Sequence, residues 1–318
     1  MLHIYFPDFR FFHINDLPLL KDHNIICDLS FNSLITVAII RPPEILSDIH
    51  FSCFPSLQYV LSDTTGVSHL SLSHKYPSLK VLTLRDVTPS QRESLTAASD
   101  LAFLLLQLSL RPVLRASFDY LSQLGDKSDS SLLRSDYLGR TFNDTSIGFL
   151  GFGRIGKALF RKLPSYTKSI YIYDECVSSI DPLRDVISSK PNVFLCSSIG
   201  ELFHKSDSVV IAVTDDPSRN TNLITSKQLN LSCMHSIINI SRDYVVDINH
   251  IAQALLSSSL NCYYSDFIRT DFSVDRETLY KLHSSGRMLS LPHMGGCTTF
   301  SWVQSINSLL DLFFTSAP

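Results

Sequence analysis

The sequence feature that most constrains the fold is a cluster of glycines directly after a short apolar run. Only 11 of the 318 residues are glycine, yet Gly151, Gly153 and Gly156 follow closely on the run 146–150. In the pattern G-x-G-x-x-G the first glycine permits a tight turn, and the second lets the backbone approach a pyrophosphate. The third lets helix and strand pack closely, and free N–H groups at the helix start favour an anion. The pattern predicts a dinucleotide-binding α/β unit, although by itself it also fits an ordinary glycine-rich turn.

A carboxylate follows at the spacing that a dinucleotide site requires. Asp174 ends the next apolar run, 169–173, about 20 residues beyond the glycines, where an acidic side chain accepts hydrogen bonds from the adenosine ribose. Asp174 and the adjacent Glu175 would repel a 2′-phosphate, which favours NAD over NADP. Arg154 and Ile155, between the second and third glycines, complete the predicted cofactor loop.

Short apolar runs alternate with helix-length segments along most of the chain. The runs are rich in β-branched and aromatic residues, which is typical of βαβ units and parallel sheets. A larger set begins at the glycine cluster, and a smaller set lies upstream. The predicted strands are 35–40, 59–61, 81–84, 146–150, 169–173, 193–195, 208–213, 236–240, 262–266 and 288–291. The sequence therefore predicts two α/β lobes.

One predicted helix between these lobes has two apolar sides. It runs from Ala97 to Arg111 and stops before Pro112. One stripe consists of Leu101, Leu104, Leu105 and Leu108, and the other of Phe103, Leu106 and Leu110. A helix that is apolar on both sides is expected to be buried on both. A central core helix and a dimer interface both satisfy this condition.

Composition and charge exclude several classes of protein. The chain carries 27 basic and 30 acidic residues, a net charge of −3, with no basic run, so no nucleic acid partner is expected. Its seven cysteines form no CxxC pair, which predicts neither a metal site nor a disulfide framework and fits a reducing compartment. No apolar stretch approaches the ~20 residues of a membrane span, and MLHIYFPDFRFF does not resemble a signal peptide. We expect a cytoplasmic protein without a membrane partner.

Six segments carry a resemblance that extends over nearly the whole chain. They are T-T-G-V-S-H-L-S-L at 64–72, A-S-D-L-A-F-L-L-L at 98–106, Y-L-G-R-T-F-N-D-T-S-I-G-F-L-G at 137–151, I-I-N-I-S-R-D-Y-V-V-D at 237–247, Y-S-D-F-I-R-T-D-F at 264–272 and L-P-H-M-G-G-C-T at 291–298. In order and spacing they resemble the D-isomer-specific 2-hydroxyacid dehydrogenase family. The resemblance implies a Rossmann doubly wound NAD-binding domain, residues 97–293, inserted into a smaller flavodoxin-like substrate domain, residues 1–96 plus 294–318. It also implies a homodimer packed around the helix from Ala97 to Arg111.

The resemblance assigns roles to individual residues. Arg242, Asp271 and His293 occupy the positions of the family's arginine, acid and histidine. Thr214 and Asp266 would line the cofactor cleft, with Asp266 at the nicotinamide carboxamide. Backbone N–H groups of Thr65, Gly66 and Val67, together with Arg242, would bind the substrate carboxylate.

Elementary chemistry agrees with these roles. Reduction of a 2-keto acid places negative charge on the ketone oxygen and needs a proton donor. A histidine beside a carboxylate is a suitable acid, because the negative partner raises its pKa, and arginine offers a planar fork of donors for a carboxylate. The chain also departs from the family pattern. Asp271 is one methylene shorter than the family's glutamate, Phe272 replaces a proline, Asp243 replaces the glycine after Arg242, and Thr214 stands where many members have proline.

These observations predict an NAD-dependent oxidoreductase that interconverts a small 2-keto acid and a D-2-hydroxy acid, with a phosphoglycerate dehydrogenase-like reaction as one candidate. The departures leave one alternative open, a catalytically weak member that binds NAD(H) as a sensor or regulator. Arg41 follows the predicted strand 35–40 and could contact an anionic substrate tail or be an ordinary surface arginine.

Overall fold

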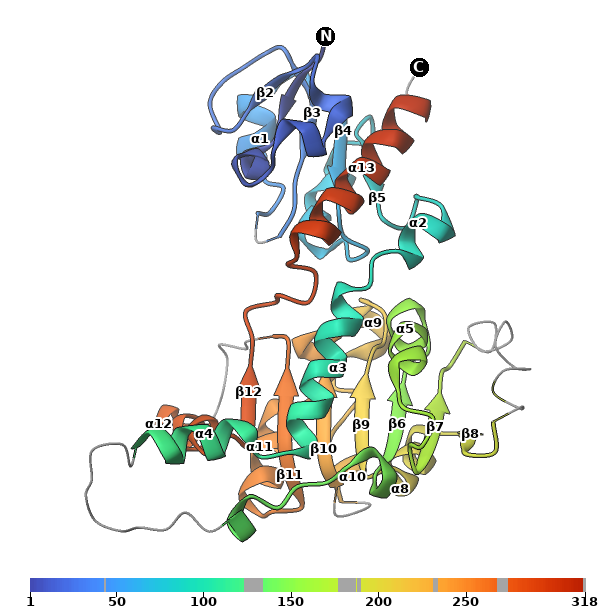
Figure 1. Cartoon of the computed structure of the whole chain (residues 1–318). Coiled ribbons are helices and arrows are strands. Elements are labelled where there is room, and N and C mark those ends of the chain that lie inside the picture. Colours follow the sequence, from blue (N-terminus) through green and yellow to red (C-terminus); the bar gives the residue numbers. More distant parts are fainter. Residues whose placement is uncertain are drawn as a thin grey trace. The chain divides into compact units, whose positions relative to one another are not determined.

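The computed structural model describes residues 1–42, 44–122, 134–176, 187, 190–230, 234–267 and 274–316. The chain divides into two compact units (Figure 1). Unit 1 consists of Met1–Thr96 and Gly296–Pro318, and unit 2 consists of Ala97–Gly295. Each unit holds one sheet in which every described pair of strands is parallel. The predicted α/β class is therefore confirmed.

Unit 1 is built on a five-stranded sheet in the order β2-β1-β3-β4-β5, which is the flavodoxin-like order. Its strands are β1 His3–Tyr5, β2 Asn24–Ile26, β3 Ile35–Ile39, β4 Tyr59–Ser62 and β5 Lys80–Thr83. Its α-helices are α1 Asp48–Cys53, α2 Pro89–Glu93 and α13 Thr299–Ser316, and 3-10 turns occupy Pro7–Phe11, Ile14–Asp16, Pro18–Leu20 and Ser68–Lys75. The three downstream strands were predicted. β1 and β2 were missed, because three residues are too few to establish a period of two and only 3-10 turns separate these strands, so the alternation with helix-length segments that indicated the equally short β8 (Val193–Leu195) is absent here.

Both ends of the chain contribute to the core of unit 1. Val37 and Ile39 of β3 face one side of the sheet, where they pack with Ile306 and Leu310 of α13. Ala38 faces the other side and belongs to a cluster with α1. Successive residues of a strand point to opposite faces, so both faces of this sheet are covered.

Unit 2 is built on a seven-stranded sheet in the order β12-β11-β10-β9-β6-β7-β8. Its strands are β6 Ser146–Leu150, β7 Ser169–Tyr173, β8 Val193–Leu195, β9 Ser208–Ile211, β10 Met234–Asn239, β11 Leu260–Ser265 and β12 Met288–Ser290. Its α-helices are α3 Ala97–Leu110, α4 Val113–Ser122, α5 Arg154–Lys162, α8 Ile199–Lys205, α9 Pro217–Asn220, α10 Ser226–Leu229, α11 Ile248–Leu256 and α12 Arg276–Ser284, and 3-10 turns occupy Arg134–Tyr137, Phe142–Asp144 and Asp243–Val245. All seven strands lie within a few residues of the predicted runs.

The sheet of unit 2 is doubly wound. Val210 of β9 packs with residues of α3 and α5 on one face, while Val209 and Ile211 pack with residues of α8, α10 and α11 on the other. The first strand of this sheet along the sequence is β6. Strands β7 and β8 lie on one side of it, and β9 to β12 lie on the other. Ligands of such sheets bind outside the carboxyl ends of the strands at this reversal, which here lies between β6 and β9.

The predicted two-sided helix is α3, which packs against α5, β10 and β11. Leu105, Leu106 and Leu110 are buried, whereas Leu104 is 50% exposed. Leu101, Phe103 and Leu108 are partly buried against the same core. The two predicted stripes therefore do not form one face toward unit 2 and one face away from it, because residues of both stripes pack in the core of unit 2.

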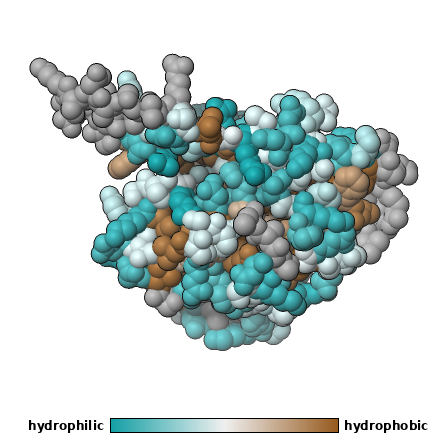
Figure 2. All heavy atoms as spheres, turned by 90° about the horizontal axis from the view of Figure 1, so that it is seen from below, coloured by the Kyte–Doolittle hydropathy of each residue, from teal (hydrophilic) through white to brown (hydrophobic). Residues whose placement is uncertain are grey.

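No single helix among the described residues is long and apolar enough to cross a membrane. One bent pair of segments, Pro89–Leu110 and Val113–Leu121, reaches the required length and apolar composition only when the two segments are taken together. Figure 2 shows a face on which hydrophilic and intermediate residues predominate and hydrophobic ones form separate small groups.

Candidate cofactor and catalytic site

The glycine cluster forms the turn between β6 and α5. Gly151 has φ +91°, a region that favours glycine, and a Cβ there would lie 2.7 Å from the carbonyl oxygen of Ala212. A Cβ on Gly156 would lie 2.6 Å from the carbonyl oxygen of Gly151, whereas a Cβ on Gly153 would meet no described atom within 4 Å. Gly151 and Gly156 are therefore required by packing. Gly153 leaves open space at the N-cap of α5, where a pyrophosphate could approach the backbone.

Asp174 lies directly beside this turn. Its Oδ2 accepts a hydrogen bond from the backbone N–H of Phe152 at 2.6 Å, and its Oδ1 accepts one from that of Cys176 at 2.8 Å. Each carboxylate oxygen can accept more than one hydrogen bond, so both can still receive ribose hydroxyls. Arg154 and Ile155 form the first turn of α5. These residues fit a dinucleotide in composition and arrangement.

Thr214 is exposed and follows β9. Its carbonyl oxygen accepts a hydrogen bond from the side-chain amide of Asn220 at 2.8 Å, so α9 fixes the backbone at this position. Thr214 therefore lies at the carboxyl end of β9, beside the reversal of the sheet between β6 and β9; its role toward the cofactor stays a prediction.

Arg242 lies in the loop after β10, and Asn239 holds that loop. The side chain of Asn239 donates to the carbonyl oxygen of Arg242 at 2.9 Å and accepts from the N–H of Ser241 at 3.0 Å. The Arg242 guanidinium donates through Nη1 to the carbonyl oxygen of Ser241 at 2.8 Å, and its Nη2 lies 3.2 Å from Oδ2 of Asp215. Asp215 in turn accepts a hydrogen bond from the Tyr244 hydroxyl at 2.6 Å. The guanidinium is thus contacted by the loops after β9 and β10.

His293 and Arg242 are brought together by Phe267. The guanidinium carbon of Arg242 lies 5.6 Å from the centre of the Phe267 ring, and the His293 ring centre lies 4.6 Å from the same ring. His293 is exposed and has φ +54°, an uncommon conformation for a residue other than glycine. Positions of this kind cluster at functional sites.

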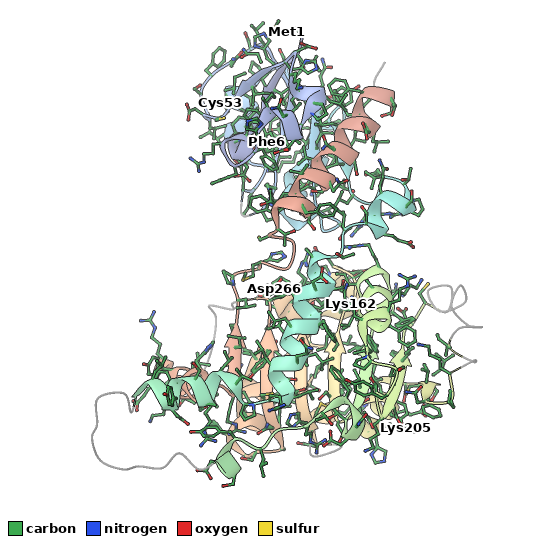
Figure 3. All side chains as sticks on the ribbon, in the orientation of Figure 1. Met1, Phe6, Cys53, Lys162, Lys205 and Asp266 are labelled. Atoms are coloured by element: carbon green, nitrogen blue, oxygen red, sulfur yellow. The ribbon has the colours of Figure 1, made fainter. Side chains whose placement is uncertain are left out.

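Asp266 holds the backbone that follows His293. It is 3% exposed, and its two carboxylate oxygens accept hydrogen bonds from the N–H groups of Met294 and Gly295 at 2.8 and 2.7 Å. Figure 3 shows Asp266 at the carboxyl end of β11. Burial raises the pKa of this carboxyl group, while the two N–H groups and the nearby Arg242 lower it. The resemblance implied a contact between Asp266 and the nicotinamide carboxamide; the contacts that the structure describes are to the backbone that follows His293.

The surroundings of His293 affect its protonation in a direction that we did not expect. Although the residue as a whole is exposed, neighbouring groups displace water from the ring; this desolvation and the positive charge of Arg242 lower the pKa of His293, and Asp215 and Asp243 oppose this. The resemblance predicted a raised pKa on the basis of Asp271. That residue lies outside the described residues, so the described neighbours alone favour neutral imidazole.

We expect the His293 ring in the cofactor-free protein to titrate below the ordinary pKa of ~6.5. The variant Arg242→Gln removes the positive charge and should move the pKa upward. NMR titration of ring-labelled histidine measures both values, with His293→Asn used to assign the resonance. A wild-type pKa above the ordinary value would mean that a carboxylate other than those described dominates the ring.

The predicted substrate loop belongs to unit 1. Thr65, Gly66 and Val67 follow β4, and the Thr64 hydroxyl donates to the carbonyl oxygen of Gly66 at 2.7 Å. The loop is anchored by a backbone hydrogen bond from Leu84 to Thr64 at 3.1 Å. Arg242 and His293 belong to unit 2.

Arg41 is buried, so the interpretation of Arg41 as an ordinary surface arginine is wrong. It is 8% exposed, and its guanidinium lies 3.5 Å from Asp8, 3.3 Å from Asp63 and 3.7 Å from the ring centre of Trp302. Burial raises the pKa of Asp63, and Arg41 lowers it. The Arg41 guanidinium already pairs with two carboxylates. The structure therefore does not support the hypothesis that Arg41 contacts an anionic substrate tail.

Asp215, Tyr244 and Phe267 were not predicted as site residues. One signal could have indicated Asp215 and Phe267, because each follows a predicted strand of the parallel sheet at the end where ligands bind. Tyr244 lies further from its predicted strand and carries no such signal. Among the described residues no cluster of histidine, cysteine or acidic side chains could hold a metal ion.

Comparison with known proteins identifies the family. Residues 114–295 match the model of the D-isomer specific 2-hydroxyacid dehydrogenase, NAD binding domain, which is more than half of the chain. The chain belongs to this family, and unit 2 carries its NAD-binding domain. NAD, the predicted cofactor, is confirmed by this match.

Curated relatives are matched over part of their length. The chain is 28% identical over 153 residues to D-3-phosphoglycerate dehydrogenase of Haemophilus influenzae, which is 48% of this chain and 35% of that protein. It is 28% identical over 204 residues to glyoxylate reductase of Pyrococcus horikoshii, 64% of this chain and 57% of that protein.

Solved structures share the fold over the whole chain. D-2-hydroxyisocaproate dehydrogenase superposes with a TM-score of 0.74 at 14% identity and covers 99% of this chain and 97% of its own. D-lactate dehydrogenase of Aquifex aeolicus superposes with a TM-score of 0.73 at 17% identity, covering 99% and 95%. The predicted arrangement of a Rossmann unit and a flavodoxin-like unit is confirmed as a fold.

Proposed function

We propose that this protein transfers a hydride between NAD(H) and a small 2-keto acid or D-2-hydroxy acid. The observation that carries the proposal is the grouping of Arg242, Phe267 and His293 at the carboxyl ends of β10, β11 and β12, in the same unit as the cofactor turn. A cation that can bind a carboxylate and an acid–base side chain are the two groups that this chemistry needs. Unit 1, with the loop Thr65, Gly66 and Val67, is the proposed substrate domain.

In the proposed reaction NADH, when bound, supplies the hydride that forms the new C–H bond at C2. Arg242 binds the substrate carboxylate through its planar set of donors. His293, as imidazolium, gives its proton to the ketone oxygen, which becomes the hydroxyl, and in the reverse direction neutral His293 removes that proton. Asp266 orients the segment that carries His293.

We keep Asp271 as the proposed carboxylate partner of His293, on the resemblance alone. A negative partner would raise the His293 pKa and offset part of the lowering caused by desolvation and Arg242. The variant Asp271→Asn should then move the alkaline limit of keto-acid reduction to lower pH, and Asp271→Glu should retain or increase activity. No observation on the described residues favours the sensor alternative.

The test of the proposed function is NADH oxidation with glyoxylate, hydroxypyruvate, phosphohydroxypyruvate, pyruvate and branched 2-keto acids. We expect turnover of at least one unphosphorylated acid. Absence of turnover across this series, with NADH still bound, would favour the sensor alternative instead.

The cofactor preference gives a second expected result. We propose that Asp174 favours NADH over NADPH, because its oxygens can accept the ribose hydroxyls and would repel a 2′-phosphate. Asp174→Ala should weaken NADH binding about 10-fold or more, the value of one hydrogen bond to a charged group, and narrow the preference. Fluorescence titration with both cofactors measures this. Glu175→Gln removes a neighbouring charge that pairs with Arg219 and should leave most of the preference intact.

Apolar residues outside the core support a homodimer as a further proposal. Leu104 of α3 is 50% exposed, and α4 exposes Val113, Phe118 and Leu121 at 51%, 54% and 60%. A second copy of the chain packed on α3 and α4 would cover them. Light scattering should report a dimer at micromolar concentration, and Leu104→Glu with Phe118→Glu should give a folded monomer. A wild-type monomer would contradict the proposal.

We also propose a cytoplasmic location. The described cysteines are all free thiols, which fits a reducing compartment.

A further inference from the structure

Asp215 is a buried acid that contacts the proposed substrate-binding arginine. Its side chain is 7% exposed, although it follows β9 in a loop. One oxygen, Oδ1, accepts a hydrogen bond from the hydroxyl of Tyr244 at 2.6 Å, and the other, Oδ2, lies 3.2 Å from Nη2 of Arg242.

The burial of Asp215 makes it dependent on these two partners. A buried carboxylate is stable only when it is paired or hydrogen-bonded. Among the described residues Oδ2 has no well-directed hydrogen bond, so the charge of Arg242 is its compensation. Because Tyr244 fixes the other oxygen, the carboxylate holds a defined position, and the guanidinium is attracted to it.

The consequence for Arg242 is that both of its terminal nitrogens are engaged. Nη2 faces Asp215, and Nη1 donates to the carbonyl oxygen of Ser241 at 2.8 Å. A guanidinium has five N–H donors in a rigid plane, so contacts at two nitrogens fix that plane and leave further donors for a ligand. Bidentate binding of a carboxylate requires such a fixed orientation.

We propose that Asp215, held by Tyr244, is a positioning residue that sets the orientation of the Arg242 guanidinium for the carboxylate of the 2-keto acid. The inference rests on the proposed function, in which Arg242 binds that carboxylate. A simpler role would be electrostatic, since a negative charge beside Arg242 also weakens its attraction for any anion. The two roles predict different kinetics.

The variant Asp215→Asn separates them. Because Asp215 and Asp243 also raise the pKa of His293, kcat is compared at low pH, where the rate of each variant no longer depends on pH. There a purely electrostatic Asp215 predicts a lower KM and an unchanged kcat, because the substitution removes a charge that repels the substrate. A positioning Asp215 predicts a kcat lower by about 10- to 100-fold, since small misplacements of a binding group cost rates of this order. The matched control is Asp243→Asn, which removes a charge from the residue next to Arg242 and should lower KM without lowering kcat. Tyr244→Phe keeps the ring but removes the hydroxyl that holds Asp215, and it should lower kcat as Asp215→Asn does.

NMR of the Arg242 side chain gives a readout that does not depend on turnover. In the cofactor-free wild type, rotation of the guanidinium should be restricted, and Asp215→Asn should make it fast while Asp243→Asn should not. If the wild type reduces no keto acid but shows this restriction, the proposed function fails and the orienting contact stands. Unchanged kcat or unchanged guanidinium rotation in Asp215→Asn would overturn the inference.

Discussion

Replacing His293 with asparagine should lower kcat for keto-acid reduction by about 100- to 10,000-fold, the usual contribution of a positioned acid–base group. Asparagine retains a polar side chain but cannot deliver the proton to the ketone oxygen. NADH binding should be unchanged, because the cofactor turn at Gly151 to Gly156 and Asp174 does not include His293. Steady-state kinetics together with a cofactor titration measure both quantities on the same preparation.

The pH dependence of the wild type checks the same residue. The described surroundings lower the His293 pKa, and reduction requires the protonated ring. In the free enzyme kcat/KM for reduction should therefore fall as the pH rises through a value below ~6.5, whereas kcat/KM for oxidation should rise through it. Near-full reduction activity in His293→Asn would remove His293 from the mechanism.

Replacing Arg41 with methionine should destabilise unit 1 by about 3–5 kcal/mol, the usual cost of removing one partner from a buried ion pair. The substitution leaves Asp63, whose side chain is 4% exposed, without its counter-charge, and also removes the cation from the ring of Trp302. Chemical denaturation followed by tryptophan fluorescence measures the change, since Trp302 is the only tryptophan in the sequence.

Two variants control this measurement. Arg10→Met changes an exposed arginine of the same unit and should have little effect, as surface substitutions usually do. Arg41→Met combined with Asp63→Asn removes both charges and should recover much of the loss. The deficit of Arg41→Met should also shrink as the pH falls, because burial raises the Asp63 pKa and the protonated acid needs no cation. If Arg41→Met and the wild type had equal free energies of unfolding, the contacts of Arg41 with Asp63 and Trp302 would contribute nothing to the stability of unit 1.

The fold was predictable where short apolar runs alternate with helix-length segments. All seven strands of unit 2 follow runs in this alternation, including β8 and β12 with three residues each, and the glycine cluster was correctly predicted to lie between the first strand and its helix. β1 and β2 escaped, since His3–Tyr5 and Asn24–Ile26 have three residues each, no helix-length segment separates them, and Ile4 and Ile25 pack in a cluster with α13, about 300 positions away along the chain. A local pattern cannot indicate a partner at that distance.

The sequence indicated some residues of the candidate site but not the contacts among them. The resemblance placed Arg242 and His293 in one catalytic group, and the structure places both beside Phe267. It could not indicate that Asp266 binds the backbone of Met294 and Gly295, nor that Asp215 pairs with Arg242, because both contacts join loops that follow different strands. The expected rise of the His293 pKa stays a prediction, because it depends on Asp271, which lies outside the described residues; the lowering effect of the nearby Arg242 guanidinium was not anticipated.

The most direct test of the central claim is to follow the hydride. The protein is incubated with a 2-keto acid that it reduces and with NADH deuterated at C4 of the nicotinamide, on each face in turn, and the product is analysed by mass spectrometry and chiral chromatography. The account predicts that, with one of the two labelled forms, deuterium appears at C2 of a D-2-hydroxy acid. A product without deuterium at C2 from either form, or an L-2-hydroxy acid, would contradict it.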